Sequence, residues 1–243
     1  TPTTPPVEIT LTPFLTSISS FGFMKCRTLT HITIPFSVRS IEVYAFYGCT
    51  SLIEIKIPPS VTSIRACCLL DCSSLEQITI PSSVNVIEGS VFFFICRFVE
   101  LIDKYTFTGC TSLSKVLIPD SVTTIESHAF CGCESLEQIS IPSSVKDISD
   151  GVFEQCTKLT QITIPPRVYS ISDRTFNGCK SLKQISFYNN VESFGCASFN
   201  GCLSLEQIEI PSSMINIYTG AFYECKSLKK IVIPSSVRKI ENH

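Results

Sequence analysis

One spacing constrains this chain of 243 residues more than any other feature, because similar residues recur every 23 positions. Two columns of mostly isoleucine keep this step, and so does a phenylalanine column three residues before a recurring cysteine. The cysteine column falls into two blocks: Cys26, Cys49 and Cys72, then Cys110, Cys133, Cys156, Cys179, Cys202 and Cys225. A fixed period of this length is typical of a solenoid, in which each repeat is one structural unit stacked on the next.

The secondary structure of one repeat can be predicted from its apolar pattern. Ile139 and Ile141 alternate with polar residues, which is the period of a half-buried strand. Pro142 ends this strand because it cannot donate a ladder hydrogen bond. Val145 and Ile148 form a second, shorter apolar pair in an extended segment. The sequence therefore predicts a β-rich repeat solenoid in which equivalent strands form a parallel sheet.

Two irregularities interrupt the period. Cys72 and Cys110 are 38 residues apart, and the intervening stretch predicts a truncated repeat near 87–102 that contains the aromatic segment Phe92–Phe98. Either the strands on its two sides, around Ile78 and Val116, pair directly, or the sheet is split there. The second irregularity is the segment 186–190, Ser-Phe-Tyr-Asn-Asn, which replaces the usual Ile-Pro-Ser-Ser turn. We expect residues 1–243 to form a single domain of about ten repeats.

The 14 cysteines suggest a disulfide framework at first sight, but their spacing argues against one. Stacked side chains of one column run parallel, whereas a disulfide needs two converging Cβ atoms. The column also has an odd number of members. We therefore predict buried, reduced thiols that act as small apolar fillers and weak S–H donors. Cys131 and Cys133 are too isolated for a zinc site, which needs four convergent ligands.

Catalytic chemistry has little support in the sequence. Histidine occurs only at His31, His128 and His243, and no orienting third group is evident for a Cys–His pair in the repeat of His128. No glycine-rich phosphate loop or metalloprotease motif occurs. We predict no enzyme, with no catalytic, metal or cofactor-binding residue and no cofactor. The balance of 19 basic and 21 acidic residues argues against nucleic-acid binding, and the longest apolar run is too short for a membrane span.

The repeat unit Cys-x-Ser-Leu-x-x-Ile-x-Ile-Pro-x-Ser-Val resembles the 23-residue leucine-rich repeats of BspA-like surface proteins. The segments Cys133–Val145 and Cys202–Met214 carry this match. The resemblance implies a leucine-rich repeat arc with a parallel concave β-sheet and short strands or turns on the convex side. It also implies a cell-surface or secreted adhesion or host-interaction protein that binds a protein or extracellular-matrix ligand. The thiol-rich core and the lack of Asn-x-Ser/Thr sequons leave a cytoplasmic scaffold or regulatory protein–protein interaction module as the alternative.

A partner of such a solenoid would bind the exposed side chains of its strands. Rows of glutamine and threonine recur there, and they form either cross-strand hydrogen-bond and packing ladders or contacts with a partner. Lys56, Leu117, Glu209 and Val232 break these rows, so they are the candidate partner-binding residues on the concave face. Both ends of the sequence look like interrupted repeats, which predicts a longer natural protein, or end-to-end or side-to-side self-association.

Overall fold

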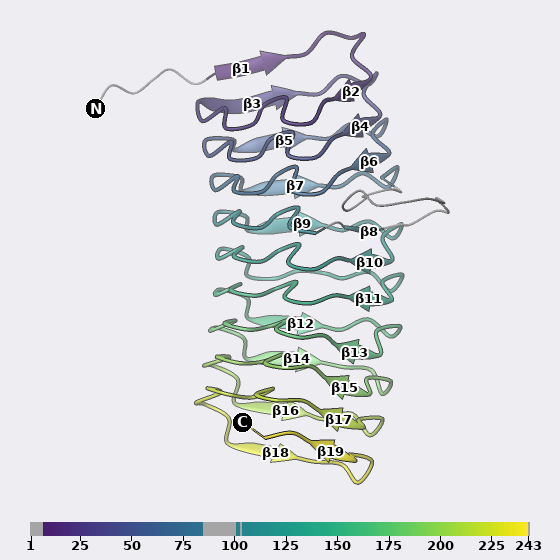
Figure 1. The fold of residues 1–243 in the computed structure, drawn as a ribbon, viewed down its shortest axis with the longest axis vertical. Coiled ribbons are helices and arrows are strands. Elements are labelled where there is room, and N and C mark those ends of the chain that lie inside the picture. Colours follow the sequence, from purple (N-terminus) through teal and green to yellow (C-terminus); the bar gives the residue numbers. More distant parts are fainter. Residues whose placement is uncertain (1–6, 85–100, 103, 243) are drawn as a thin grey trace, which may run out of the picture.

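The computed structural model describes residues 7–84, 101–102 and 104–242 of the chain. They form an elongated stack of coils with β1 (Val7–Thr10) and β19 (Lys239–Ile240) at opposite ends of the stack (Figure 1). This part of the chain contains strands and turns but no helix, and every pair of strands is parallel. The predicted fold class, a parallel β-solenoid, is confirmed.

The longer strands form one face of the stack. They are β1 (Val7–Thr10), β3 (Leu29–Thr33), β5 (Glu54–Lys56), β7 (Gln77–Thr79), β9 (Lys115–Leu117), β12 (Gln161–Thr163), β14 (Gln184–Ser186), β16 (Gln207–Glu209) and β18 (Lys230–Val232). Between β9 and β12, isolated bridges at Gln138 and Ser140 continue the ladder. We call the outward side chains of these strands and of residues 138 and 140 the long-strand face.

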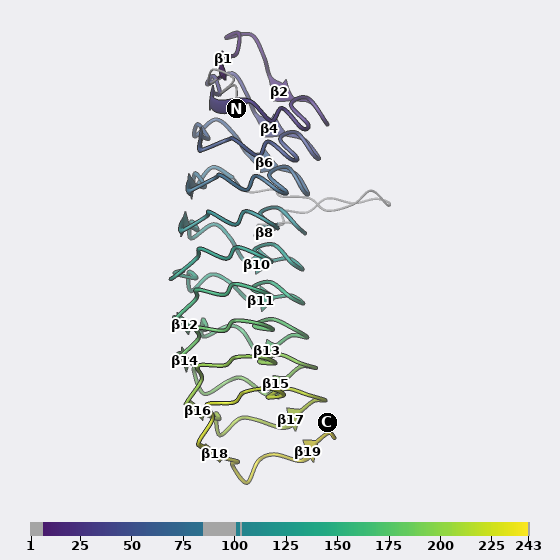
Figure 2. The ribbon, with the colours of Figure 1, turned by 90° about the vertical axis from the view of Figure 1, so that its left-hand side faces the viewer.

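The shorter strands have two residues each and lie on the other side of the stack (Figure 2). They are β2 (Ser17–Ile18), β4 (Ser40–Ile41), β6 (Ser63–Ile64), β8 (Leu101–Ile102), β10 (Thr124–Ile125), β11 (Asp147–Ile148), β13 (Ser170–Ile171), β15 (Ser193–Phe194), β17 (Asn216–Ile217) and β19 (Lys239–Ile240). Equivalent residues face each other 23 positions apart, as Ile171 and Phe194 do. The stack bends only slightly along its length.

The irregular 38-residue step leaves the long-strand ladder intact. Strand β7 pairs directly with β9, with Ile78 opposite Val116. The coils on both sides also contact each other, since the Asp71 N–H donates to the Thr108 carbonyl at 2.8 Å. Of the two alternatives, direct pairing is therefore correct and the sheet is not split. The predicted truncated repeat near 87–102 and the segment Phe92–Phe98 lie mostly outside the described residues.

Columns of identical side chains fill the core. Phe107, Phe130, Phe153 and Phe176 are fully buried and stack ring on ring, with centroids 5.1 to 5.8 Å apart. Cysteines of neighbouring coils add a hydrogen bond to each step: the Cys156 Sγ donates to the Phe130 carbonyl at 3.2 Å. No disulfide joins any of the described cysteines. Such stacking buries the apolar face that a single repeat would leave in water.

Each coil contains a tight turn in which two residues adopt the left-handed backbone conformation. One of them lies five residues before the column cysteine, and the other lies one residue before it. Bulky residues adopt positive φ there, as at Tyr44 (56°), His128 (58°) and Gln155 (59°). The strain is offset because the N–H of such a residue bonds to the next coil. For example, the Gln155 N–H donates to the Asn177 carbonyl at 2.7 Å.

Candidate functional site

The long-strand face is exposed because its strands alternate between core and solvent. In β9, Val116 is buried while Lys115 and Leu117 are exposed, and β7, β12, β14 and β16 repeat the pattern. Parallel pairing aligns equivalent side chains of successive strands in rows across the stack. A rigid β ladder thus holds a flat array of side chains toward solvent.

The structure places all four candidate residues, Lys56, Leu117, Glu209 and Val232, on this face with exposed side chains. Leu117 is 52% exposed and Val232 is 64% exposed. Glu209 and Val232 face each other in register on β16 and β18, so the fold brings these two together. Leu117 pairs instead with Thr79 and Ser140. Lys56 lies on β5, where its Nζ is 3.7 Å from a carboxylate oxygen of Glu54.

The glutamine row of this face does not form the predicted hydrogen-bonded ladder. Gln138, Gln161 and Gln184 face one another in register, and Gln207 occupies the next position. Within the described ranges, the side-chain amides of these four residues make no hydrogen bond to any protein group. Each amide therefore presents unsatisfied donors and an acceptor to solvent on a fixed backbone.

Two adjoining depressions lie on the long-strand face. One, of about 890 Å³, extends over β9, residues 138–141, β12 and β14, and Leu117 is on its border. The other, of about 620 Å³, lies over β14 and β16 and includes Glu209. Gln184 and Ser186 line both depressions. Leu117 and Glu209 therefore border one continuous surface, although they lie four repeats apart.

The smaller depression coincides with a break in the sheet. Strands β12 and β14 form one sheet, β16 and β18 form another, and no ladder joins β14 to β16 although they are neighbours in the stack. From β1 to β14, by contrast, pairs and bridges connect every step of the described ladder. We call this interruption between β14 and β16 the seam.

Two aromatic residues lie in the repeat next to the seam. Phe187 stands where the other repeats have isoleucine or, at Leu11, leucine, and Phe194 stands where the other repeats have isoleucine. Their ring centroids are 5.4 Å apart, and both rings also contact the ring of Phe199. Two phenylalanine side chains need more volume inside the coil than two isoleucines, and we expect this packing to favour the seam. The other pairs of this repeat, β12 with β14 and β15 with β13 and β17, are intact.

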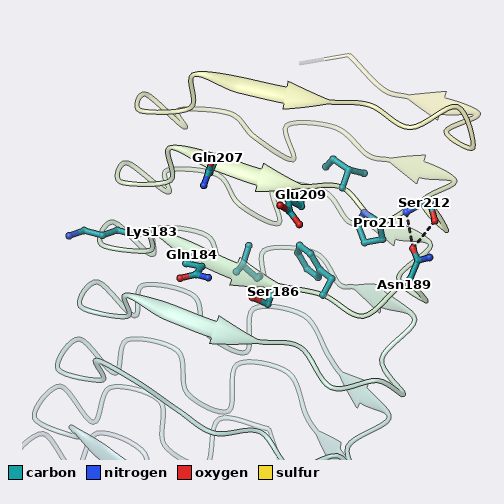
Figure 3. Close-up of a pocket in the computed structure, with 11 residues that line it drawn as sticks. Lys183, Gln184, Ser186, Asn189, Gln207, Glu209, Pro211 and Ser212 are labelled. Atoms are coloured by element: carbon teal, nitrogen blue, oxygen red, sulfur yellow. Dashed lines mark hydrogen bonds between the residues drawn. The ribbon is translucent and has the colours of Figure 1, made fainter.

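A side chain bridges the seam where the backbone ladder is missing. The Asn189 Oδ1 accepts hydrogen bonds from the Ser212 N–H at 2.9 Å and from the Ser212 hydroxyl at 2.8 Å (Figure 3). Asn189 belongs to the irregular segment 186–190, in which Tyr188 replaces the usual proline. The depression therefore has a fixed rim rather than two loosely connected edges.

The two ends of this depression differ in charge. Figure 3 shows that Lys183 points away from the depression, whereas the Glu209 carboxylate points toward Ser186. Among the described residues, no basic group lies within 4.0 Å of the Glu209 carboxylate. Its end of the depression thus presents an uncompensated negative charge beside neutral amide and hydroxyl groups.

Comparison with known proteins agrees with this geometry. The family model for the BspA type leucine rich repeat region matches residues 6–102, 93–195 and 146–243, which together cover nearly the whole chain. The chain belongs to the BspA-type leucine-rich repeat family. No curated protein sequence matches it.

Solved structures resemble this BspA-type chain over most of its length. A leucine rich cell surface protein from Faecalibacterium prausnitzii A2-165 is 26% identical with a TM-score of 0.58, covering 97% of this chain and 78% of that one. The T. pallidum leucine rich repeat protein is 26% identical with a TM-score of 0.53, covering 82% and 78%. The pneumococcal vaccine antigen PcpA is 20% identical with a TM-score of 0.63, covering 96% and 68%, and this likeness concerns the fold alone.

The tight-turn edge of the BspA-type chain holds a polar cluster that the sequence did not indicate. The His128 Nε2 is 3.3 Å from a Glu154 carboxylate oxygen, and the His128 ring stacks on Tyr105. Glu154 thus orients the histidine, and sequence analysis offered no candidate for this role because Glu154 belongs to the next repeat. Burial and the nearby Glu154 raise the pKa of Cys131 to about 11, so this thiol is protonated at neutral pH.

Neither metal binding nor a membrane-spanning helix is indicated in the described part of the chain. No cluster of histidine, cysteine and carboxylate side chains there could hold a metal ion. The same residues include no helix long and apolar enough to cross a bilayer.

Sequence reasoning found Glu209 but missed the seam residues Phe187 and Asn189. The irregular segment 186–190 was the available signal. Its effect depends on the packing of Phe187, which directly follows β14, against Phe194 on β15, and a linear pattern does not show that contact.

Proposed function

We propose that this BspA-type chain is a non-enzymatic binding module that holds a protein or extracellular-matrix ligand on its long-strand face. The observation that supports this most is the continuous surface from Leu117 to Glu209, in which rigid strands carry exposed side chains without protein partners. A backbone that is already ordered loses little conformational entropy on binding. Lys56, Leu117, Glu209 and Val232 are the proposed contact residues.

We place this module at the cell surface, in adhesion or host interaction. The Faecalibacterium prausnitzii relative is described as a leucine rich cell surface protein, and this description supports the proposal. The test is a protein and matrix array probed with the folded chain at micromolar concentration. We expect retained ligands, and no binding at that concentration would contradict the proposal.

Two variants, one on the long-strand face and one on the other side of the stack, test whether the ligand binds the long-strand face. Leu117→Ser combined with Val232→Ser removes two exposed aliphatic contacts, so the retained signal should fall at least about fivefold. Tyr169→Ser is the matched control because Tyr169 is 60% exposed but precedes β13 on the other side of the stack. Equal losses in both variants would contradict the assignment.

A second candidate function is an intracellular scaffold, which the reduced thiols favour. Cytosolic thiols are kept reduced, whereas secreted proteins rich in cysteine are usually cross-linked. An export signal in the complete coding sequence would exclude this candidate.

We also propose that residues 1–243 form a single domain and that copies associate end to end or side to side. Direct pairing of β7 with β9 supports the first statement. One unfolding transition seen by both near-UV and far-UV circular dichroism is expected, and two separate transitions would contradict it. Light scattering during size-exclusion chromatography tests association, and a monomer at every concentration would contradict it.

A further inference from the structure

We propose that the smaller depression, which lies at the seam, binds a single basic side chain of a partner protein at its Glu209 end. We expect this side chain to be arginine in preference to lysine. This inference rests on the proposed function, because it names the chemistry of a partner at the same face. It is carried by three features that coincide there: an unpaired carboxylate, exposed amide groups and an aromatic side chain.

The carboxylate is the first feature. Glu209 is the single acidic residue in the outward third position of the described three-residue strands, where the other members are lysine, threonine, serine, leucine or valine. In the described structure it has no ion pair, and it points into the depression beside Ser186 (Figure 3). A cation that binds there would therefore displace only water.

Neutral acceptors surround the carboxylate. The amide oxygens of Gln184 and Gln207 and the hydroxyl of Ser186 line the same depression, and no hydrogen bond to other described groups engages these side chains. A guanidinium has five N–H donors in a planar fork and no acceptor, so it can satisfy a carboxylate and neighbouring amide oxygens together. An anionic ligand would meet Glu209 repulsively, which disfavours acidic partners at this end.

Phe187 distinguishes arginine from lysine. Its side chain lines the depression and is partly exposed. The flat guanidinium stacks on aromatic rings and is more weakly hydrated than an ammonium group. The depression of about 620 Å³ also leaves room for the flanking backbone of a partner segment.

The test uses three capped tripeptides, Ac-Gly-Arg-Gly-NH₂, Ac-Gly-Lys-Gly-NH₂ and Ac-Gly-Gln-Gly-NH₂, titrated into the ¹⁵N-labelled full chain. We expect the arginine peptide to shift backbone amides of residues 184–187 and 207–209 at millimolar concentration. Lysine should bind more weakly and glutamine not measurably. Glu209→Gln should weaken arginine binding by about tenfold because a charge-assisted hydrogen bond is lost.

Glu206→Gln is the matched control. Glu206 is an exposed carboxylate one repeat step from Lys229, with which it pairs at 2.7 Å, and it does not line the depression. This variant should leave arginine binding unchanged. Equal shifts with the arginine and glutamine peptides, shifts elsewhere on the chain, or no effect of Glu209→Gln would overturn the inference.

The two proposals fail in different ways. If array ligands bind the long-strand face but the peptides show no preference for arginine, only the basic-side-chain inference is wrong. If the arginine peptide binds at the seam but the array retains no ligand, the inference stands and the proposed function in its adhesive form falls.

Discussion

The ring of Phe187 lies 5.4 Å from the ring of Phe194 at an interplanar angle of 41°, inside one coil of the stack. Both residues stand at positions where most repeats have isoleucine, and no ladder joins the adjacent long strands β14 and β16. We expect this packing in the core to shape the surface on which we place the binding site. This coupling between core and surface can be tested directly.

Restoring isoleucine at both positions should close the seam. Phe187→Ile and Phe194→Ile should each lower the free energy of unfolding by about 1–3 kcal/mol, since each leaves space beside the other ring. The double variant should be less destabilised than the sum by about 0.5–1 kcal/mol, because strands β14 and β16 can then pair. Urea unfolding measures the energies, and slower hydrogen exchange at residues 184–187 reports the new pairing. Additive energies with unchanged exchange would contradict this explanation.

The cysteine column should stabilise the stack through packing and its S–H donors. The Cys156 thiol is fully buried and donates to the Phe130 carbonyl at 3.2 Å. Cys156→Ala should therefore lower the free energy of unfolding by about 1–2 kcal/mol. Cys196→Ala, at a partly exposed thiol outside the column, is the control and should change it by less than about 0.5 kcal/mol. Equal effects of the two changes would argue against a structural role for the column.

Alkaline pH should destabilise this protein steeply. Burial raises the pKa of Cys49 and of Cys110 to about 12, and it raises the pKa values of Cys72, Cys133 and Cys156 well above their usual range. The folded state thus keeps protons that the unfolded chain releases above about pH 9. The free energy of unfolding keeps its full value below the pKa of the thiols in the unfolded chain. Above that pKa it falls by about 1.4 kcal/mol for each such thiol and each pH unit.

Urea unfolding at several pH values between 8 and 10.5, in the presence of a reductant, measures this slope. The five thiols named above should together give a loss of about 5–7 kcal/mol per pH unit once the unfolded thiols are ionised. Cys156→Ala should reduce the slope by one thiol's share. A slope no steeper than that of a single thiol would contradict a protonated column.

The left-handed turn positions offer a matched pair of changes. Gly151 has φ of 61°, and an added Cβ would lie 2.6 Å from the His128 Nε2, so Gly151→Ala should destabilise by about 1–3 kcal/mol. Ala197 occupies the equivalent position two repeats later with φ of 53°. Ala197→Gly should stabilise by about 0.5–1 kcal/mol because it removes the Cβ from a left-handed backbone. Thermal and urea unfolding measure both, and changes of the same sign would refute the turn assignment.

Deleting residues 86–100 should restore the 23-residue period without harming the stack. Joining residue 85 to Leu101 recreates the spacing between Val61 and Ser63 in the earlier repeat, and β7 already pairs with β9. Because fewer residues then separate Val84 from Leu101, stability should be equal or higher by up to about 1 kcal/mol. Circular dichroism and urea unfolding measure the outcome. A clear loss of stability would show that the deleted residues contribute to the core.

Much of the fold could be predicted because the repeat encodes it locally and many times over. Ile139 and Ile141 alternate with polar residues, Pro142 ends the strand, and most repeats show the same pattern. The left-handed turns were harder to predict from the sequence, since Tyr44 and His128 adopt a backbone conformation that their residue types disfavour. Their positive φ is stabilised by hydrogen bonds to the next coil. The site was predicted in part: Leu117 and Glu209 stood out as exceptions in an exposed row, but their shared place on one continuous surface of two depressions did not.

The sequence by itself determined the solenoid, the parallel sheet, the inward columns and the reduced thiols, because a period of 23 residues allows only one way to bury so many equivalent apolar side chains. The tertiary structure alone decided which alternative holds at the 38-residue step, where β7 meets β9. It also decided that β14 and β16 separate at the seam. The first outcome depends on backbone pairing across an irregular step, and the second concerns two strands that lie one repeat apart. A pattern read along the chain does not specify such contacts between repeats.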